Sequence, residues 1–437
     1  MRLPVLLREG RTFTSLRRHR NFRLYVIGQT ISNAGTWAQM AALTWLVLQE
    51  THSALALGAF GVWSLAPYVA LGIFGGVIID RFDRRLTLIA TQTAFLALAV
   101  TLAALTWNGG APVWLLYGIG ALDGIVQVVD APAGMAFVRQ MVGPNDLANA
   151  VGLNSASFSA MRIVGPAVAG GLIVLGGVRL CFAMNALSYV VMLGALVTLR
   201  PAELLPLVRS EPRASPIHDL VEGFHYAWRM PSVRVALLTL VGVAAISFNF
   251  TPWLAVLAAQ TLRAGPEVFG LITAAFGAGA LLGALAVASW ARATWPAMLA
   301  SLGGLSLGLA LLAPLRSLAL IFVMLVVVGA MRTIYLATSN TLVQLDSPEQ
   351  LQGRVAGLYT YALTATATPG ALLAGWLAQV GGTTLAFAVA SAANALICGA
   401  GLIWYLGWRR AQSERVMVEQ DAHAIMRDGP PCADEAP

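Results

Sequence analysis

The sequence contains no lysine, few charged residues of any kind, three cysteines and five histidines. Only 11% of the residues are charged, whereas about 25% is usual for a soluble domain, so a soluble enzyme and a disordered chain are excluded. The cysteines, Cys181, Cys398 and Cys432, are too scattered for a disulfide framework or a CxxC metal site. The histidines form no cluster with ligand spacing, and we expect no metal and no cofactor. Without lysine the chain cannot form a nucleotide-binding P-loop, which excludes direct use of ATP.

Hydrophobic residues make up 58% of the 437 residues, and the mean hydropathy is +0.74. A helix that crosses a bilayer needs about 20 consecutive, mostly apolar residues. Twelve such stretches occur, near residues 22–48, 54–79, 86–107, 113–138, 150–175, 179–199, 233–259, 266–290, 295–314, 318–344, 353–378 and 383–408. We therefore predict an all-α integral membrane protein with twelve transmembrane helices.

One long connector, at residues 200–232, divides the twelve stretches into six and six. Apolar residues recur in it at helical spacing, at positions 217, 220, 221, 224 and 228, which predicts an amphipathic helix on the membrane surface. The polar tail contains Gly429-Pro430-Pro431 and is expected to be disordered. The predicted divisions are a cytoplasmic arm (1–21), a first six-helix bundle (22–199), the connector (200–232), a second six-helix bundle (233–408) and a cytoplasmic tail (409–437).

All 27 basic residues are arginine, and their distribution orients the chain. By the predicted spans, 22 lie on the side of the termini and the connector, and three lie opposite, at Arg179, Arg263 and Arg316. Basic loops stay in the cytoplasm, so both termini and the connector are expected there. The net charge of +7 is then a topology signal, and we expect no binding to nucleic acid. The Arg-rich first 20 residues contain no apolar run of the kind that forms a signal peptide.

The two sets of six stretches share a weak internal repeat. Residues 120–123 (Gly-Ala-Leu-Asp) correspond to 329–332 (Gly-Ala-Met-Arg), and 144–147 (Pro-Asn-Asp-Leu) correspond to 348–351 (Pro-Glu-Gln-Leu). Gly165-Pro166 and Pro369-Gly370 follow in the same order. A duplicated six-helix unit predicts two pseudo-symmetric bundles around a central cavity at the middle of the bilayer.

Residues 75–85 read Gly-Gly-Val-Ile-Ile-Asp-Arg-Phe-Asp-Arg-Arg. They resemble the signature loop of the major facilitator superfamily, Gly-x-x-x-Asp-Arg-x-Gly-Arg-Arg, with Asp83 in place of the second glycine. The chain also resembles the exporter branch of that superfamily, which carries enterobactin-type siderophores and drugs. This second resemblance rests on Gly28-Gln29 and Trp45-Leu46-Val47, on Asp130-x-Pro132, and on Arg162-x-x-Gly165-Pro166.

The resemblance implies the major facilitator fold in a bacterial cytoplasmic (inner) membrane. It also implies a protein that works as a monomer in the lipid bilayer. One departure concerns Gly134-Met135, where the exporter branch usually has Arg-Gln. Details of substrate and gating are therefore not carried over from that segment.

Four ionisable residues fall inside predicted helices, where charge is costly and usually functional: Asp123, Asp130, Arg162 and Arg332. Asp123, Gln127 and Asp130 share one helix face, since they are spaced i, i+4 and i+7. One hypothesis is that Asp123 or Asp130 exchanges a proton during transport, with Arg162 neutralising one of them. The alternative is a static pair of Asp130 and Arg162 that locks neighbouring helices.

Arg332 occupies the repeat position of Asp123 with the opposite charge. In a central cavity it would attract anionic substrates; alternatively, it is a partner for a helix dipole or for backbone carbonyls. Aromatic and amide side chains are the candidate walls of such a cavity. They are Asn33, Trp37, Gln127, Asn154, Phe158, Asn249, Trp253, Tyr335 and Tyr359. Lipid contact or core packing is the alternative for each.

Two further patterns are candidates for the conformational change. Gly76, Asp80, Arg81, Arg84 and Arg85 in the signature loop are the candidate cytoplasmic gate, because an Asp at a helix end accepts charge-assisted hydrogen bonds. The alternative for the arginines is plain membrane anchoring. The second pattern resembles the antiporter motif of exporters, and packing of small residues is the alternative there. Its residues are Gly165, Pro166, Gly170 and Gly171.

The sequence as a whole favours a secondary active exporter of small amphipathic molecules, of siderophore or drug type. It would work by alternating access and proton antiport. An uptake symporter on the same fold is the first alternative, opposed only by the antiporter-like pattern. A membrane enzyme or a non-transporting scaffold is the second, and the chain offers neither a catalytic constellation nor a signalling domain for it. The expected partners are a small-molecule substrate, protons and lipid.

Overall fold

The computed structural model describes residues 13–205, 216–290, 293–348 and 351–427, with side chains described outside 73–81, 216–217, 219 and 411–427. These ranges are helical with short turns and contain no β-strand. The helices of the first part are α1 (Thr14–Arg18), α2 (Arg20–Thr51), α3 (Ala54–Arg81), α4 (Arg84–Trp107), α5 (Val113–Gly176), α6 (Val178–Thr198) and η3 (Pro201–Glu203). Those of the second part are α7 (Pro216–Arg229), α8 (Pro231–Ser247), α9 (Phe250–Val256), η4 (Leu257–Thr261), α10 (Pro266–Ser289), α11 (Trp295–Leu312), α12 (Leu318–Leu345) and α13 (Gln352–Arg427).

Nine of the described helical segments are long and apolar enough to cross a membrane. In lipid every backbone group must find a partner within the protein, and a helix provides one for all but its ends. Polar side chains cap several of those ends. The Ser53 hydroxyl accepts the Ala56 N–H at the start of α3 (3.2 Å), and the Asp83 carboxylate accepts the Leu86 N–H at the start of α4 (2.9 Å).

Two of the nine segments consist of two helices joined at a glycine kink. α5 turns at Gly143, whose φ of 71° lies in the left-handed region that glycine adopts without strain. α13 turns at Gly381 and Gly382, where Gly382 has a φ of 65°. Dividing these two segments turns the nine into eleven helices. The 32-residue α2, which packs among them, is a further one, so the helices are consistent with the twelve predicted spans.

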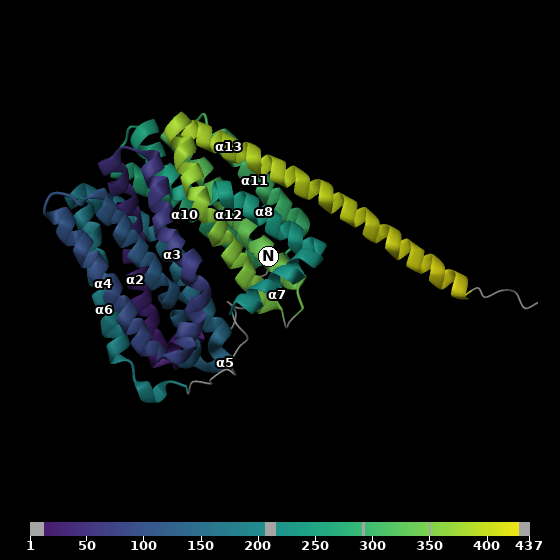
Figure 1. Ribbon diagram of the computed structural model, residues 1–437, viewed down its shortest axis with the longest axis horizontal. Helices are drawn as coiled ribbons and strands as arrows, with labels where there is room; N and C mark the ends of the chain where they lie inside the picture. The colour runs from purple at the N-terminus through teal and green to yellow at the C-terminus, as the bar shows by residue number, and fades with distance from the viewer. Residues whose placement is uncertain (1–12, 206–215, 291–292, 349–350, 428–437) are drawn as a thin grey trace, which may run out of the picture.

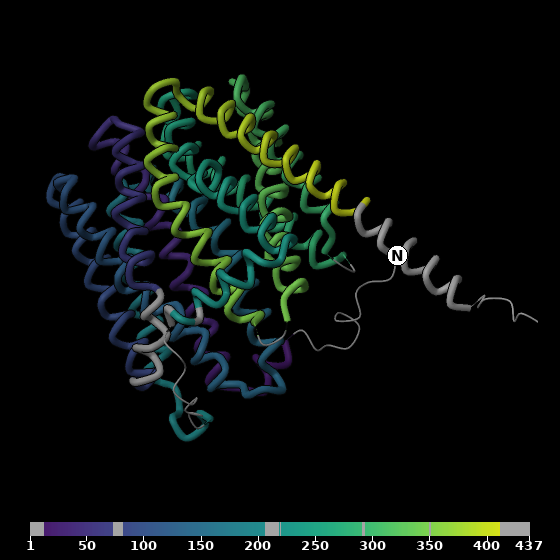
Figure 2. The backbone as a smooth tube through the Cα atoms, turned by 45° about the vertical axis from the view of Figure 1, so that its right-hand side comes forward, coloured from purple at the N-terminus to yellow at the C-terminus, as the bar shows by residue number. Residues whose placement is uncertain are grey.

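The helices form two halves that lie side by side in Figure 1 and Figure 2, with α1–α6 in one half and α7–α13 in the other. In the first half α3 packs along α5, and both α2 and α4 pack along α6. In the second half α10 packs along α12, and both α8 and α11 pack along α13. The same pairing recurs in the same order, as a duplicated six-helix unit requires.

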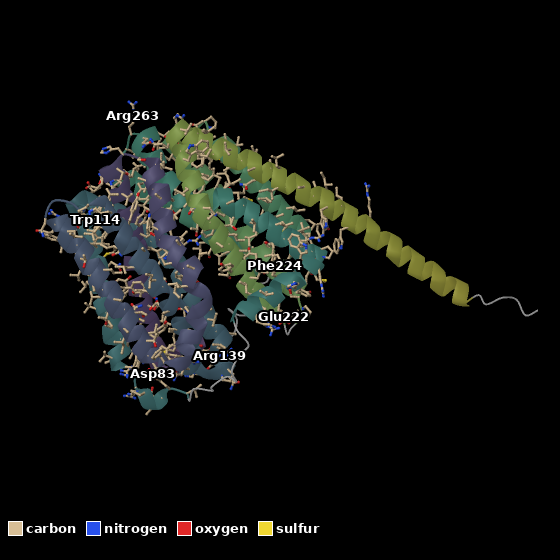
Figure 3. All side chains as sticks on the ribbon, viewed as in Figure 1. Asp83, Trp114, Arg139, Glu222, Phe224 and Arg263 are labelled. Carbon is tan, nitrogen blue, oxygen red and sulfur yellow. The ribbon has the colours of Figure 1, made fainter. Side chains whose placement is uncertain are left out.

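The outer surface of the bundle is apolar. Trp114, labelled in Figure 3, is 73% exposed, and Leu175 and Ile403 are 80% and 75% exposed. Many large apolar side chains are exposed in this way. Lipid solvates such a surface, whereas in water it would make the protein associate. The structure thus agrees with an integral membrane protein.

The predicted surface helix of the connector is present as α7, where Val221, Phe224 and Trp228 are exposed as an amphipathic helix requires. The expectation of a disordered tail is wrong for residues 409–427, because α13 continues to Arg427. That stretch is rich in Ala, Glu, Gln, Arg and Met, which favour a helix. Residues 1–12 of the predicted arm and residues 428–437 lie outside the described residues.

The two ends of the molecule differ. We call the end that carries Arg263 the closed end, and the end that carries Asp83, Arg139 and Glu222 the connector end (Figure 3). At the connector end the His19 ring lies 2.9 Å from the carboxylate of Asp146 within the first half. In the second half Glu222 pairs with Arg354 at 2.7 Å. The described hydrogen bonds and ion pairs at this end each stay within one half, although α3 also approaches α7 there.

Near the closed end the two halves touch backbone to backbone. A Cβ atom on Gly270 of α10 would stand 2.7 Å from the carbonyl oxygen of Pro166 and 2.8 Å from Cα of Gly170, both on α5. Gly58 of α3 meets the carbonyl of Ala371 of α13 in the same way. Small residues thus allow α5 to pack against α10 and α3 against α13 across the boundary between halves.

Polar and aromatic contacts reinforce this closure. The amide oxygen of Gln379 accepts the backbone N–H of Ala54 at 2.8 Å. The ring of Trp45 stacks on that of Phe269, with 5.6 Å between centroids. The halves are therefore joined at the closed end.

Candidate functional site

The first half contains a pair of carboxylates on one face of α5. Asp130 accepts hydrogen bonds from the Thr91 hydroxyl at 2.5 Å and from the Gln92 amide at 3.0 Å, both on α4. Asp123 lies two helical turns before Asp130 on the same face of α5. No donor to Asp123 occurs among the side chains that the structure describes. Of the predicted common face, Asp130 thus contacts α4, and the place of Gln127 beside a substrate stays a prediction.

Tyrosine rings surround the two carboxylates. Tyr189 stacks on Phe95 with 5.6 Å between centroids, and it is close enough to interact electrostatically with Asp123 and Asp130. Tyr25, packed edge-on against Phe137, interacts with Asp130 in the same way. The carboxylates therefore lie in a mostly apolar, aromatic environment, where a charge is expensive unless it is paired or hydrogen-bonded.

Thr91 and Gln92 were not identified from the sequence. The signal was available, because Thr91, Gln92 and Thr93 interrupt an otherwise apolar span. An interruption of this kind in a membrane helix indicates a polar partner on a neighbouring helix.

The predicted neighbour of the carboxylates, Arg162, is not paired with them. The described part of the chain contains no ion pair between Arg162 and Asp123 or Asp130. Arg162 lies beyond the Gly143 kink of α5, where its carbonyl oxygen would be 3.4 Å from a Cβ on Gly277 of α10. The kink sends the second part of α5 to the boundary between halves, which separates Arg162 from the carboxylate pair.

Arg162 instead lies towards Arg332, because its carbonyl oxygen faces Gly277 of α10 and the ring of the adjacent Phe276 lies beside the Arg332 guanidinium. Arg332 is 9% exposed and belongs to α12 of the other half. It donates a weak hydrogen bond to the carbonyl oxygen of Phe248 at 3.4 Å. Its guanidinium carbon lies 5.0 Å from the ring centre of Phe248 and 5.9 Å from that of Phe276. The sequence predicts a backbone carbonyl as the alternative partner of Arg332, and the contact with Phe248 is of that kind. No carboxylate pairs with the Arg332 charge among the described residues.

Two of the predicted cavity residues belong to the core of the second half. Trp253 is fully buried, and its indole N–H donates to the carbonyl of Ala374 at 2.9 Å. Tyr335 is fully buried as well, and its hydroxyl donates to Thr239 at 3.1 Å. Both polar groups are satisfied within the protein, so the prediction that these two residues line the cavity is wrong for this conformation.

Other predicted wall residues remain accessible at least in part. Phe158 is 45% exposed and packs edge-on against the half-buried Trp37, with 5.6 Å between ring centroids. Asn33 accepts a hydrogen bond from Gln29 at 3.1 Å. The side-chain oxygen of Asn154 is buried and has no donor among the described residues.

The remaining two wall residues, Asn249 and Tyr359, are held by backbone carbonyls. Asn249 donates to Ala367 at 2.7 Å, and Tyr359 donates to Leu336 at 3.1 Å. Tyr359 also lies near enough to Arg332 for an electrostatic interaction. Their place beside a substrate stays a prediction.

The predicted gate residues are only partly described. Gly76, Asp80 and Arg81 lie on α3, in the stretch whose side chains lie outside the described residues. Arg84 donates to the carbonyl of Ala136 at 3.3 Å, and Arg85 donates to two carbonyls at the C-terminal end of α6 at 2.8 and 2.9 Å. In this conformation the two arginines join helices of the first half, and the role of Asp80 as a latch stays a prediction.

The antiporter-like residues divide between two contacts. A Cβ atom on Gly165 would stand 2.5 Å from Cβ of Trp37, so this glycine serves the packing of α5 on α2. Pro166 and Gly170 contact Gly270 across the boundary between halves. Gly171 is exposed and has no atom within 4 Å of such a Cβ, so it contributes to neither contact.

Comparison with known proteins is consistent with this architecture. The family model of transmembrane secretion effectors matches residues 11–425. The chain is 27% identical over 411 residues to the MFS-type transporter YfiS of Bacillus subtilis, which covers 92% of this chain and 96% of the relative. It is 28% identical over 405 residues to the enterobactin exporter EntS of Escherichia coli, with 90% and 93% covered.

Among solved structures, a bacterial homologue of the iron transporter ferroportin in an inward-facing state has the same fold. The TM-score is 0.66 at 17% identity, and the match covers 88% of this chain and 98% of that one. The predicted major facilitator fold and its exporter-type relatives are therefore confirmed. The chain belongs to the family of transmembrane secretion effectors within the major facilitator superfamily, and it is a multi-pass membrane transporter, not an enzyme.

Proposed function

We propose that this protein is a secondary active exporter of small amphipathic anions, which it moves by alternating access in exchange for protons. The observation that carries the proposal is the pair of Arg162 and Arg332. One arginine comes from each half, both lie against residues 276–277 of α10, and neither has a carboxylate partner among the described residues. An anion bound between them would neutralise their charge.

The chemistry around the arginines favours an anion with an apolar or aromatic body. A guanidinium group binds a carboxylate through two parallel hydrogen bonds. Phe248 and Phe276 lie beside the Arg332 guanidinium, and the exposed Phe158 with Trp37 offers further aromatic surface on the first half. Enterobactin, the compound in the name of the relative EntS, agrees with transport of siderophore-type molecules.

Proton coupling is assigned to the carboxylates of the first half. Asp130 is fixed by two donors, Thr91 and Gln92, whereas Asp123 has none among the described residues. Asp123 is therefore the carboxylate that is freer to gain and lose a proton as the halves move. Asp123 and Asp130 share one face of α5. Protonation of one carboxylate therefore removes its repulsion of the other.

The direction of transport is proposed from the orientation of the chain together with its relatives. The arginine distribution favours a connector end in the cytoplasm of a bacterial inner membrane. The halves are joined at the opposite end, so in an exporter this conformation would load substrate from the cytoplasm, whereas in an importer it would release substrate there. The antiporter-like glycines at the closed end and the name of the exporter relative support export over uptake.

Transport in proteoliposomes tests the proposal. We expect entry of an anionic siderophore or drug into inside-out oriented vesicles to be accompanied by proton release. Replacement Asp123→Asn should abolish this proton movement, because an amide cannot exchange a proton. Glu203→Gln makes the same carboxylate-to-amide change at an exposed position and should leave transport unchanged.

The direction of coupling separates the candidate mechanisms. Proton and substrate moving together would identify an uptake symporter, and substrate movement with normal proton flux in Asp123→Asn would move coupling to another residue or ion. Absence of any substrate movement across siderophores and drugs would contradict the transporter proposal for these compounds.

A further inference from the structure

A cavity lies at the closed end. None of its lining residues belongs to the carboxylates and arginines described above. Its volume is about 360 Å³. It is lined by the end of α2 in the first half and by the turn around η4 in the second. The lining residues are Trp45, Leu48, Gln49, His52, Ala259, Gln260, Arg263 and Ala264.

The polar groups of this cavity are mainly hydrogen-bond donors. Trp45 is 4% exposed, and its indole N–H is buried with no acceptor among the described residues. Gln49, Gln260, His52 and Arg263 form an exposed rim, and each carries N–H groups. None of the eight described lining residues has a carboxylate. The unpaired indole N–H and the Arg263 guanidinium only donate, so they favour a ligand that supplies acceptors, while the glutamine amides can donate or accept.

The backbone also singles out this cavity. His52 and Arg263 are the two non-glycine residues with a positive φ in the described part of the chain, each at 51°. Both follow the end of a helical segment, where glycine would adopt this conformation at lower cost. Strained positions of this kind, about 1–3 kcal/mol each, concentrate at ligand sites. An arginine and a histidine, which both carry N–H donors, occupy these two positions at one cavity.

The helix ends themselves do not provide free acceptors at the nearest carbonyls. Leu48 O accepts the N–H of His52 at 2.8 Å, and Ala258 O accepts the N–H of Ala264 at 2.9 Å. With these two carbonyls occupied, Arg263 and the Trp45 N–H are the polar groups of the cavity that can only donate, and Arg263 carries the positive charge.

We propose that this cavity binds a second ligand, a small anion with several acceptor oxygens on an aromatic or apolar body, such as an aromatic carboxylate. Arg263 and the two glutamines would hold the oxygens, while Trp45 and Leu48 contact the body. Because its walls come from both halves, the cavity exists only while this end is closed, and a bound ligand holds the protein in that state. The consequence for transport rests on the proposed function; binding itself does not.

Equilibrium binding to the purified full-length protein in lipid nanodiscs tests the proposal. The probe is 2-naphthoate, and its neutral amide 2-naphthamide is the control ligand. Trp45→Phe keeps an aromatic ring and removes the indole N–H together with the five-membered ring that carries it, so we expect at least about tenfold weaker binding of 2-naphthoate. Arg263→Gly should weaken binding at least as much without lowering the melting temperature, because glycine accepts the positive φ.

A central-site variant separates the two sites. Arg332→Ala should leave the Trp45- and Arg263-dependent binding in place, even if transport fails. Equal affinity for 2-naphthoate in wild type, Trp45→Phe and Arg263→Gly would overturn the proposal, as would equal binding of 2-naphthamide. A lower melting temperature in Arg263→Gly with unchanged affinity would assign that residue to the turn alone.

The closing effect has its own measurement. With 2-naphthoate added on the closed-end side of proteoliposomes, substrate turnover should fall in wild type and not in Arg263→Gly. Equal inhibition of both proteins, or none in wild type, would show that the ligand does not hold the closed end shut.

Discussion

Replacing Gly270 by alanine should shift the protein away from the conformation in which the closed end is closed. The added methyl group would stand 2.7 Å from the carbonyl oxygen of Pro166 and 2.8 Å from Cα of Gly170. Ordinary contact begins near 3.4 Å, so α5 and α10 must separate by roughly 0.7 Å, the difference between 3.4 and 2.7 Å. The opposing atoms are backbone atoms, which cannot rotate away as a side chain can.

The size of the effect follows from the location of the clash. Overpacking of this kind costs about 1–3 kcal/mol. Because the clash lies between halves, their separation relieves it, and the cost acts on the equilibrium between conformations. A change of about 1–3 kcal/mol corresponds to a population shift of about 5- to 150-fold.

Spin labels measure that shift directly. Asn108 in the first half and Gln260 in the second are exposed near the closed end, and labels there report the separation of the halves. In a background without the native cysteines, Gly270→Ala should move the distance distribution towards longer values. The same distribution and melting temperature as the parent protein would refute the reasoning.

Two other glycines serve as controls. Gly118 has no atom within 4 Å of an added Cβ, so Gly118→Ala should leave the distances unchanged and add about 0.5–1 kcal/mol of helix stability. Gly279 meets the backbone of Val326 within the second half, so Gly279→Ala should lower the melting temperature without changing the distances. An equal shift in all three variants would contradict the assignment to the boundary between halves.

Two further predictions concern the polar groups inside the bundle. Arg332→Ala should weaken binding of an anionic substrate by about 10- to 150-fold, as expected for loss of a hydrogen bond to a charged group. Binding of a neutral analogue should stay unchanged. Equal loss for both ligands in an equilibrium binding assay would contradict this role. Thr91→Val removes the 2.5 Å hydrogen bond to Asp130 and should slow proton-coupled transport about tenfold, with Thr91→Ser restoring it. Unchanged proton flux in Thr91→Val would show that this hydrogen bond has no part in coupling.

The sequence was sufficient to predict most of the helices because hydropathy is a local property. Every predicted span has a helical counterpart, and the connector helix is α7. The tail was misjudged for a local reason as well. Residues 409–427 are polar, but their helix-favouring composition outweighs that polarity.

The site was harder to predict because it depends on where helix faces point after packing. Proximity along α5 indicated a pair of Arg162 with Asp130, but the kink at Gly143 sends the two residues to different neighbours. Trp253 and Tyr335 have the composition of cavity residues, and only packing shows that their polar atoms already have partners in the core. Spacing fixes which residues share a face, whereas tertiary contacts decide what that face meets.

The internal repeat extends further in the structure than in the sequence, and this bears on how the halves can move. α1 precedes the first bundle and contacts Asp146 through Ser15, whereas α7 precedes the second and contacts Arg354 through Glu222. Each surface helix therefore packs on the corresponding helix start of its own half. The five residues of α1 are too few to show periodicity, so the sequence does not reveal this correspondence. Since both contacts stay within a half, rocking leaves them intact, whereas it must break the contacts that join the halves at the closed end, the glycine contacts among them.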